Sequence, residues 1–188
     1  MPLGSSKQIV VAVCIILLVA GILFAMGRTP WYKYGGPGLW SGDTTSDQNS
    51  QQLFDPYTFT HIIHGIGFYF LLWFFFREKL SPGARFLIAL GIEGSWEIVE
   101  NTDFVINRYR EATISLDYYG DSILNTIGDM LACVVGYFLA ARFSIWATIS
   151  CVLILELALL FWIRDNLILN IIMLIYPFPG IKVWQGGG

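Results

Sequence analysis

Five long apolar runs constrain this chain more than any other feature of its sequence. Each run approaches the ~20 residues that a helix needs to cross a bilayer. The runs are residues 9–26, 58–76, 86–101, 122–141 and 145–163. A sixth run, 167–176, is too short to span and ends at "YPFPG", which predicts a re-entrant or interfacial C-terminal helix. The sequence therefore predicts an all-α, polytopic integral membrane bundle, with residues 1–188 as one transmembrane domain.

The composition excludes several classes of protein. Only 13% of the 188 residues are charged, against roughly 25% in soluble domains. The formal net charge of −3 offers no basic surface for nucleic acid. The three cysteines lie inside apolar runs without a metal-binding spacing, so we interpret them as small buried hydrophobic residues.

Basic residues predict the orientation of the bundle in the membrane. Arg77, Lys79 and Arg85 lie between the second and third runs, which places that loop in the cytoplasm together with the N-terminus. Segments 28–57 and 102–120 are then extracytoplasmic loops. We expect a multi-pass protein of a bacterial cytoplasmic (inner) membrane.

With these helix directions, polar residues from several runs fall at one level of the bundle. The convergence depends only on the relative directions of the helices, so it holds for either overall orientation. These residues are His61, His64, Glu97, Glu100, Asn101, Asp121, Asn125, Asp165 and Asn166.

The only two histidines of the chain form the motif "HIIHG". His61 and His64 are three residues apart, so they are neighbours on one face of a helix. They could ligate a metal ion together. The alternative is that they form hydrogen bonds between packed helices near the membrane interface.

Three glutamates follow one stripe of the third run. Glu93, Glu97 and Glu100 are spaced i, i+4 and i+7, which places them on a single helix face. Charged groups inside a membrane segment are costly and normally face each other or a polar interior. The stripe indicates a metal or acid–base site, or else a structural network tied to Arg108 and Arg110.

The fourth run begins with "DYYGDSILNTIGDML", in which Asp121, Asn125 and Gly128 would share a face and Asp129 would turn partly aside. Asp121 is either a site residue or a helix-capping residue. An amide inside a span, such as Asn125, needs a partner. The first outer loop, with Asp55 as its best polar candidate, is expected to cover the site.

Arginines in "NRYREATIS" lie beside this acidic region. Arg108 and Arg110 would receive an anionic lipid headgroup, because guanidinium groups suit phosphate, or they would neutralise the glutamates. Asn101 and Asp117 complete the predicted substrate-binding set.

Three segments together carry a family resemblance. They are "SQQLFDPYTFTHIIHG", "WEIVENTDFVINRYREATISLDYYGDSILNTIGD" and "RDNLILNIIMLIYP", and they closely resemble an uncharacterised family of small bacterial inner-membrane proteins classed as a domain of unknown function. More distantly, the order of the polar helices is similar to VanZ-like proteins, a superfamily associated with glycopeptide-antibiotic resistance. The resemblance implies a helical membrane fold and supplies no reaction. It also implies a close cysteine pair in the first outer loop, where this chain has "WYKYGG", which argues against a metal or disulfide role there.

Three functions are compatible with the sequence. The first is a hydrolase or transferase acting on a lipid-linked substrate, in which Glu97, Glu100, Asp121 and Asn125 do the chemistry. A divalent cation (Zn²⁺, Mn²⁺ or Mg²⁺) held by His61, His64, Glu97 and Asp121 would assist, since this mixed N/O ligand set suits those ions. The second is a non-enzymatic protein that binds a lipid, an antibiotic-like ligand or a partner membrane protein. The third is a proton or ion pathway.

Overall fold

The computed structural model describes residues 6–113 and 117–187, and within these ranges it contains eight helices and no strand. The helices are α1 (Ser6–Ala25), α2 (Thr58–Phe76), α3 (Pro82–Glu100), α4 (Asp103–Ala112), α5 (Ile123–Arg142), α6 (Ile145–Trp162), α7 (Leu167–Ile175) and α8 (Pro179–Gln185). The all-helical fold is thus confirmed. Residues 114–116 of the predicted outer loop lie outside the described residues.

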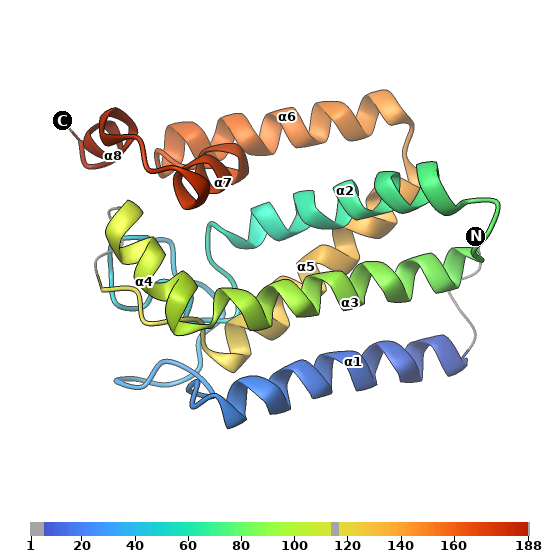
Figure 1. Cartoon of the computed structure of the whole chain (residues 1–188), viewed down its shortest axis with the longest axis horizontal. Coiled ribbons are helices and arrows are strands. Elements are labelled where there is room, and N and C mark those ends of the chain that lie inside the picture. Colours follow the sequence, from blue (N-terminus) through green and yellow to red (C-terminus); the bar gives the residue numbers. More distant parts are fainter. Residues whose placement is uncertain (1–5, 114–116, 188) are drawn as a thin grey trace.

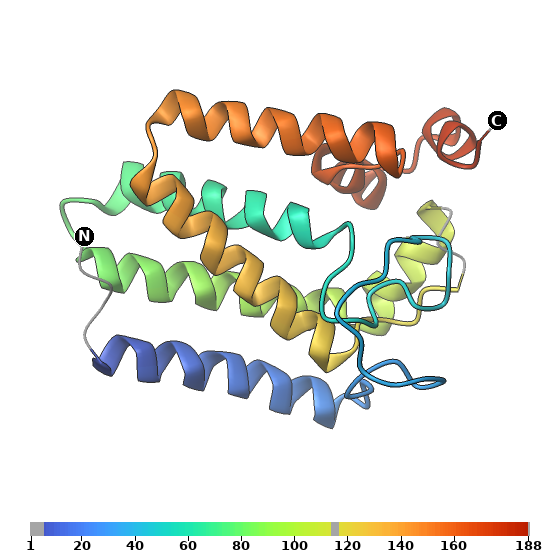
Figure 2. The same cartoon turned by 180° about the vertical axis from the view of Figure 1, so that it is seen from behind.

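The long helices form a bundle whose two ends differ. In Figure 1, α1, α3, α2 and α6 run side by side, and α5 crosses them obliquely. Figure 2, seen from behind, shows α5 in front of α2 and α3. The short helices α4, α7 and α8, together with segment 28–57, gather at one end, which we call the polar end. The α2–α3 connection lies at the opposite end.

The closest contact in the bundle joins α2 to α5, and two glycines make it possible. A Cβ atom on Gly65 of α2 would lie 2.0 Å from the carbonyl oxygen of Cys133, and one on Gly136 of α5 would lie 1.9 Å from that of Ile62. Backbone cannot yield at such distances, so only glycine permits this crossing. The crossing brings the first turns of α2, at Ile62 and Gly65, against the second half of α5, at Cys133 and Gly136.

Four helices are long and apolar enough to span a membrane, namely α1, α2, α5 and α6. The five-span count is therefore not confirmed. The exception is α3, which has 19 residues but carries Arg85 and the three glutamates. These charges make it too polar to count as a span by composition, although it packs lengthwise between α1 and α2 (Figure 1).

Serine caps begin three of the long helices. Ser81, Ser122 and Ser144 each accept a hydrogen bond from the backbone N–H three residues ahead. Such caps satisfy one of the free N–H groups of a helix start. Inside the predicted outer loop, Thr102 caps α4 in the same way, which explains a helix where the sequence analysis predicts only a loop.

Candidate functional site: a buried histidine and carboxylate cluster

Five side chains from three helices meet inside the bundle near the polar end. We call them the histidine cluster: His61 and His64 from α2, Glu93 and Glu97 from α3, and Asp129 from α5. His61 Nδ1 lies 2.6 Å from Glu93 Oε1, and His64 Nδ1 lies 3.1 Å from Glu93 Oε2. One glutamate therefore holds both imidazoles.

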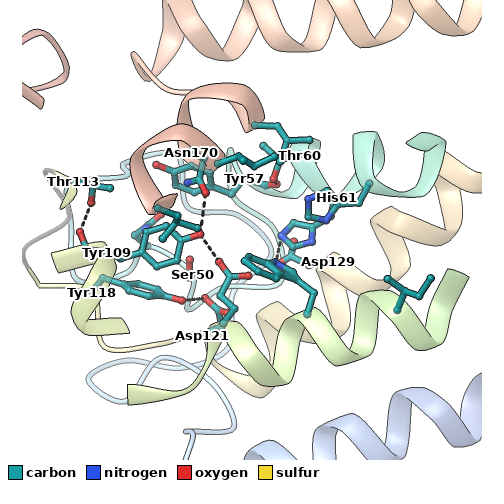
Figure 3. Close-up of a pocket in the computed structure, with 18 of the residues that line it drawn as sticks. Ser50, Tyr57, Thr60, His61, Tyr109, Thr113, Tyr118, Asp121, Asp129 and Asn170 are labelled. Atoms are coloured by element: carbon teal, nitrogen blue, oxygen red, sulfur yellow. Dashed lines mark hydrogen bonds and ion pairs between the residues drawn. The ribbon is translucent and has the colours of Figure 1, made fainter. Parts of the chain in front are cut away.

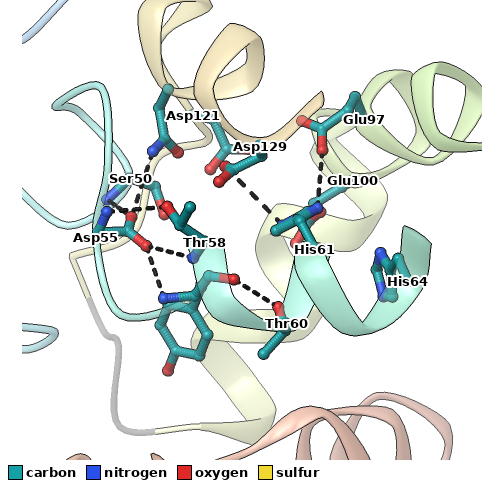
Figure 4. Close-up of polar contacts among 12 residues, drawn as sticks. Ser50, Asp55, Thr58, Thr60, His61, His64, Glu97, Glu100, Asp121 and Asp129 are labelled. Carbon is teal, nitrogen blue, oxygen red and sulfur yellow. Dashed lines mark hydrogen bonds and ion pairs between the residues drawn. The ribbon is translucent and has the colours of Figure 1, made fainter. Parts of the chain in front are cut away.

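The other two carboxylates of the cluster approach the two different ring nitrogens of His61. Glu97 Oε1 lies 3.3 Å from Nδ1, and Asp129 Oδ2 lies 3.9 Å from Nε2. Figure 4 shows both carboxylates directed at His61, Glu97 from α3 and Asp129 from α5. One ligand atom from each of these three residues can be chosen so that all lie within 4.8 Å of one another.

Glu97 is the most unusual side chain of the cluster. It is 0% exposed, and neither of its carboxylate oxygens has a hydrogen-bond partner among the described residues. Asp129 Oδ1 shares this condition within the described part of the chain. A buried carboxylate normally accepts hydrogen bonds or faces a cation, because its desolvation is otherwise uncompensated.

Helix geometry explains why these residues share one face. His61 and His64 are spaced i, i+3 in the first half of α2, and Glu93 and Glu97 are spaced i, i+4 in α3. Asp129 is four residues beyond Asn125, so both lie on the side of α5 that faces α2. The sequence analysis predicts that Asp129 turns aside because it counts the helical face from Asp121. That residue precedes the helix, which begins at Ile123.

A second group of polar residues lies closer to the α4 end of the site. We call Asp55, Asn101, Tyr118, Asp121 and Asn125 the amide cluster. Asn101 Nδ2 donates to Asp121 Oδ2 at 2.8 Å, and the Tyr118 hydroxyl donates to Asp121 Oδ1 at 2.9 Å. Burial raises the pKa of Asp121 above its ordinary value, and these two hydrogen bonds act against that rise. The sequence analysis groups Asp121 with the histidines as a metal ligand, but Asp121 is in neither of the two described groups whose ligand atoms lie close enough to share an ion.

Asp55 and Asn125 form the other half of the amide cluster. Asp55 Oδ1 accepts hydrogen bonds from the backbone N–H groups of Tyr57 and Thr58, so it caps the helix that carries the histidines. Its Oδ2 accepts from the N–H of Ser50 at 3.0 Å and from Asn125 Nδ2 at 3.4 Å. The first outer loop is thereby tied to the starts of α2 and α5.

The two arginines of α4 bind backbone carbonyl groups. Arg108 donates from Nε to the Leu174 oxygen at 2.8 Å and from Nη2 to the Ile175 oxygen at 3.0 Å, at the C-terminus of α7. Arg110 donates from Nε to the Tyr118 oxygen. Among the described contacts, neither arginine pairs with a glutamate of the stripe, so the proposed structural network between them does not form. Asp117 is exposed beside the same segment.

A cavity of about 380 Å³ lies between α2, α3, α4 and α7. Its polar lining includes His61, His64 and Asp129 of the histidine cluster, and Tyr118 and Asp121 of the amide cluster. Figure 3 shows His61 and Asp129 on one side of the cavity and Tyr109 and Tyr118 on the other. Glu100 also lines it and accepts a hydrogen bond from the Tyr109 hydroxyl at 2.9 Å.

Sequence reasoning missed some residues of this site. Glu93 is noted on the glutamate stripe but is not assigned a role, and Asp129 is set aside. Tyr109 and Asn170, whose side chains are joined by a 2.9 Å hydrogen bond over the cavity, are not singled out at all. The i+4 spacing of Asp129 from Asn125 is the one signal that could have identified a member of this group.

Comparisons with known proteins give a consistent result. A family model described as "Protein of unknown function (DUF2585)" matches residues 23–187. The chain is 47% identical to a UPF0314 protein of Paracoccus denitrificans over 91% of this chain and 88% of the relative. It is 46% identical to a UPF0314 protein of Sphingopyxis alaskensis over 95% of this chain and 94% of the relative. No solved structure matches it.

Proposed function

This chain belongs to the DUF2585 family, and we propose that it is a polytopic membrane enzyme that holds a divalent cation in the histidine cluster. The reaction is hydrolysis or group transfer on a lipid-like molecule bound in the adjacent cavity. The expected resemblance to a family of unknown function is thus confirmed, and the distant resemblance to VanZ-like proteins stays a prediction.

One observation carries this proposal: the Glu97 carboxylate is fully buried and both of its oxygens lack hydrogen-bond partners among the described residues. Two further carboxylates, Glu93 and Asp129, share the same buried region. Three carboxylates so close together need a cation or shared protons. A divalent cation matches the ligand types, because oxygen with imidazole nitrogen suits Zn²⁺, Mn²⁺ or Mg²⁺.

The geometry supports a distinct role for each residue. With the proton on Nδ1, His61 donates to Glu93 and keeps the Nε2 lone pair for the metal, on the side of Asp129. Metal-binding histidines commonly donate their other N–H to a carboxylate in this way. Glu97 and Asp129 supply oxygen ligands, and Glu93 positions both imidazoles.

The cation site and the cavity share a wall. His61 and Asp129 belong to both, so a molecule in the cavity would reach the cation directly. A bound divalent cation lowers the pKa of a coordinated water and polarises a carbonyl or phosphoryl oxygen. Within the cavity, Glu100 and the Tyr109 hydroxyl bonded to it are in position to exchange a proton with the ligand.

The membrane arrangement is part of the proposal. We place α1, α2, α3, α5 and α6 across a bacterial inner membrane, with α3 as a fifth span whose carboxylates face α2 and α5. The basic residues of the α2–α3 connection, Arg77 and Lys79, favour a cytoplasmic position for that end. The N-terminus is then cytoplasmic, and the polar end with its cavity faces the outer side.

Metal analysis of the purified full chain tests the proposal. We expect about one Zn²⁺ or Mn²⁺ per chain after dialysis against that metal, and almost none in Glu97→Gln. Glu156→Gln is the matched control, because Glu156 is also a buried glutamate in a helix, but its oxygens accept hydrogen bonds from the N–H groups of Leu167 and Ile168. Equal metal content in Glu97→Gln and wild type would refute the cation site.

The same cavity favours one second candidate, a lipid-binding protein without turnover. The observation behind it is that the cavity walls are built from side chains bonded to each other, as in the Tyr118–Asp121 pair, independently of any cation. Release of product from a bound lipid by the metal-loaded protein, absent in Glu97→Gln, would exclude it. Tight binding without any product would exclude the enzyme instead.

A further inference from the structure

We propose that the cavity binds a lipid whose headgroup is uncharged and rich in hydroxyl groups, such as a glycosyl headgroup. Its role as the substrate rests on the proposed function, whereas its binding does not. The inference comes from the distribution of hydrogen-bond donors, acceptors and charges over the cavity walls.

The polar wall presents acceptors, because its hydroxyl donors are already used. The Tyr118 hydroxyl donates to Asp121 at 2.9 Å, and the Thr60 hydroxyl donates to the Tyr57 carbonyl at 2.7 Å. A hydroxyl whose single proton is committed keeps two lone pairs as an acceptor. A ligand that satisfies this wall must therefore bring donors of its own.

The charge of the wall excludes an anionic headgroup. The described lining residues include Glu100, Asp121 and Asp129 and no lysine or arginine. Arg108 and Arg110, the predicted phosphate ligands, are bonded to carbonyl groups instead. Unpaired like charges at a binding site are strongly unfavourable.

Because the acceptors are spread around the cavity, they suit a headgroup with several hydroxyl groups better than one with a single ammonium group. Thr60 comes from α2, Glu100 from α3, Tyr109 from α4 and Ser50 from the first outer loop, so the acceptors surround the cavity. Figure 3 shows Thr60, Tyr109 and Ser50 at different sides of it. A single ammonium can contact only one part of such a wall. A volume of about 380 Å³ falls within the range of small-molecule sites, roughly 300–1,000 Å³.

The rest of the lining is apolar and reaches the surface of the bundle. Phe68, Ile92 and Trp96 from α2 and α3 face Ile171 and Leu174 from α7 across it. Ile92 and Ile171 are also 39% and 47% exposed, so this part of the cavity opens on the side of the bundle. In a membrane that side faces lipid tails. The cavity thus fits an acyl chain entering from the bilayer and a polar headgroup at its inner end.

Native mass spectrometry of the full chain, with added lipids that share the same acyl chains, tests this assignment. The probes are a monoglucosyl diacylglycerol, diacylglycerol, phosphatidic acid and a long-chain amine. We expect the glucolipid to bind at least 10-fold more tightly than the other three. Tighter binding of phosphatidic acid overturns the inference. Equal or tighter binding of the amine overturns the choice of hydroxyl groups.

Variants locate the binding in this cavity. Tyr118→Phe removes one acceptor oxygen and is expected to weaken glucolipid binding about 5- to 10-fold, whereas Tyr34→Phe, an exposed tyrosine of the outer loop, leaves it unchanged. Ile171→Trp, on the partly exposed side of α7, should weaken binding by filling the apolar part, and it does not disturb a buried hydrogen bond. Unchanged binding in both cavity variants overturns the proposal.

The variant Glu97→Gln separates this inference from the proposed function. It should lose the metal and still bind the glucolipid, since Glu97 does not line the cavity. Glucolipid binding without any metal in the wild type would leave the cavity assignment intact and refute the enzyme. Metal binding without glucolipid selectivity would refute the cavity assignment and leave the cation site intact.

Discussion

The histidine cluster and the amide cluster both bury carboxylates, but they satisfy them differently. Each oxygen of Asp55 and Asp121 accepts at least one hydrogen bond from a backbone N–H, an amide or a hydroxyl. In contrast, both oxygens of Glu97 and one oxygen of Asp129 accept none from the described residues. The described residues thus supply a donor to every carboxylate oxygen of the amide cluster but not to three carboxylate oxygens of the histidine cluster. Within the amide cluster, Asn125 Oδ1 also lacks a partner among the described residues.

This contrast divides one polar region into a part that holds the helices together and a part to which we assign the proposed function. The amide cluster ties the first outer loop to the starts of α2 and α5, and Asn101 ties the end of α3 to the same point. It therefore fixes where the helices end. The histidine cluster lies between the helices so positioned, with groups left available for a ligand. Four substitutions test this division, given from the largest expected effect to the smallest.

Replacing one aspartate of each cluster with asparagine should distinguish the two clusters most clearly. We expect Asp129→Asn to weaken metal binding by more than about 100-fold, because an amide oxygen replaces a charged ligand. Asp121→Asn should bind the metal as wild type does. Isothermal titration with Zn²⁺ or Mn²⁺ measures both. Loss of metal binding in Asp121→Asn alone would return Asp121 to the ligand set that the sequence predicts.

Removing the carboxylate of the amide cluster should mainly cost stability. Asp121→Ala leaves the Asn101 amide and the Tyr118 hydroxyl without their acceptor, and each orphaned buried group costs about 1–3 kcal/mol. We expect the unfolding free energy in detergent to fall by about 2–5 kcal/mol. Asp103→Ala, at an exposed carboxylate, should unfold like the wild type. A small effect in Asp121→Ala would contradict the structural role of this cluster.

The amide cluster should also make stability depend on pH. Burial raises the pKa of Asp55 from 3.8 to about 6, and the negative charge of Asp121 adds to the rise. A carboxyl whose pKa is raised in the folded state stabilises it at low pH, and this contribution is lost between about pH 4 and pH 6. Relative to Asp55→Asn, the wild type should therefore lose up to roughly 3 kcal/mol as the pH rises through that window. Thermal unfolding of both proteins at several pH values measures it, and a constant difference would refute the assignment.

The smallest expected effect concerns the glutamate that holds the imidazoles. Glu93→Gln keeps one acceptor for His61 or His64 and removes the charge. Carboxylates that orient metal-binding histidines are typically worth 10- to 100-fold in affinity. We expect a loss of this size in the metal titration, with Glu156→Gln again as the control. Complete loss of binding would instead make Glu93 a direct ligand.

Local patterns in the chain predicted six of the eight described helices and missed α4 and α8. The run 58–76 has the bounds of α2, whereas the run 86–101 begins four residues after the start of α3 and ends one residue after its end. These agreements arise because apolar run length and capping residues act locally along the chain. The same local signals at Thr102 and Asp103 mark α4, which the prediction of a loop overlooked.

The partners of the site residues depend on contacts between distant segments. Sequence reasoning brings His61, His64 and Glu97 together from helix direction alone. It does not separate Asp121 from Asp129, which are eight positions apart, because that choice depends on where α5 begins and on how it crosses α2. Sequence proximity likewise suggested that Arg108 and Arg110 pair with the acidic residues. Tertiary packing instead makes them donate hydrogen bonds to backbone carbonyl groups.

The sequence by itself determined a set of long apolar helices with polar groups toward one end, since apolar length and helical periodicity are properties of single segments. Only the tertiary structure decided which buried carboxylates are hydrogen-bonded and which have no hydrogen-bond partner among the described residues. The physical reason is that hydrogen bonding of a buried oxygen requires a donor within about 3 Å. For Glu97 and Asp121 that distance depends on the packing of helices and loops far apart in the chain.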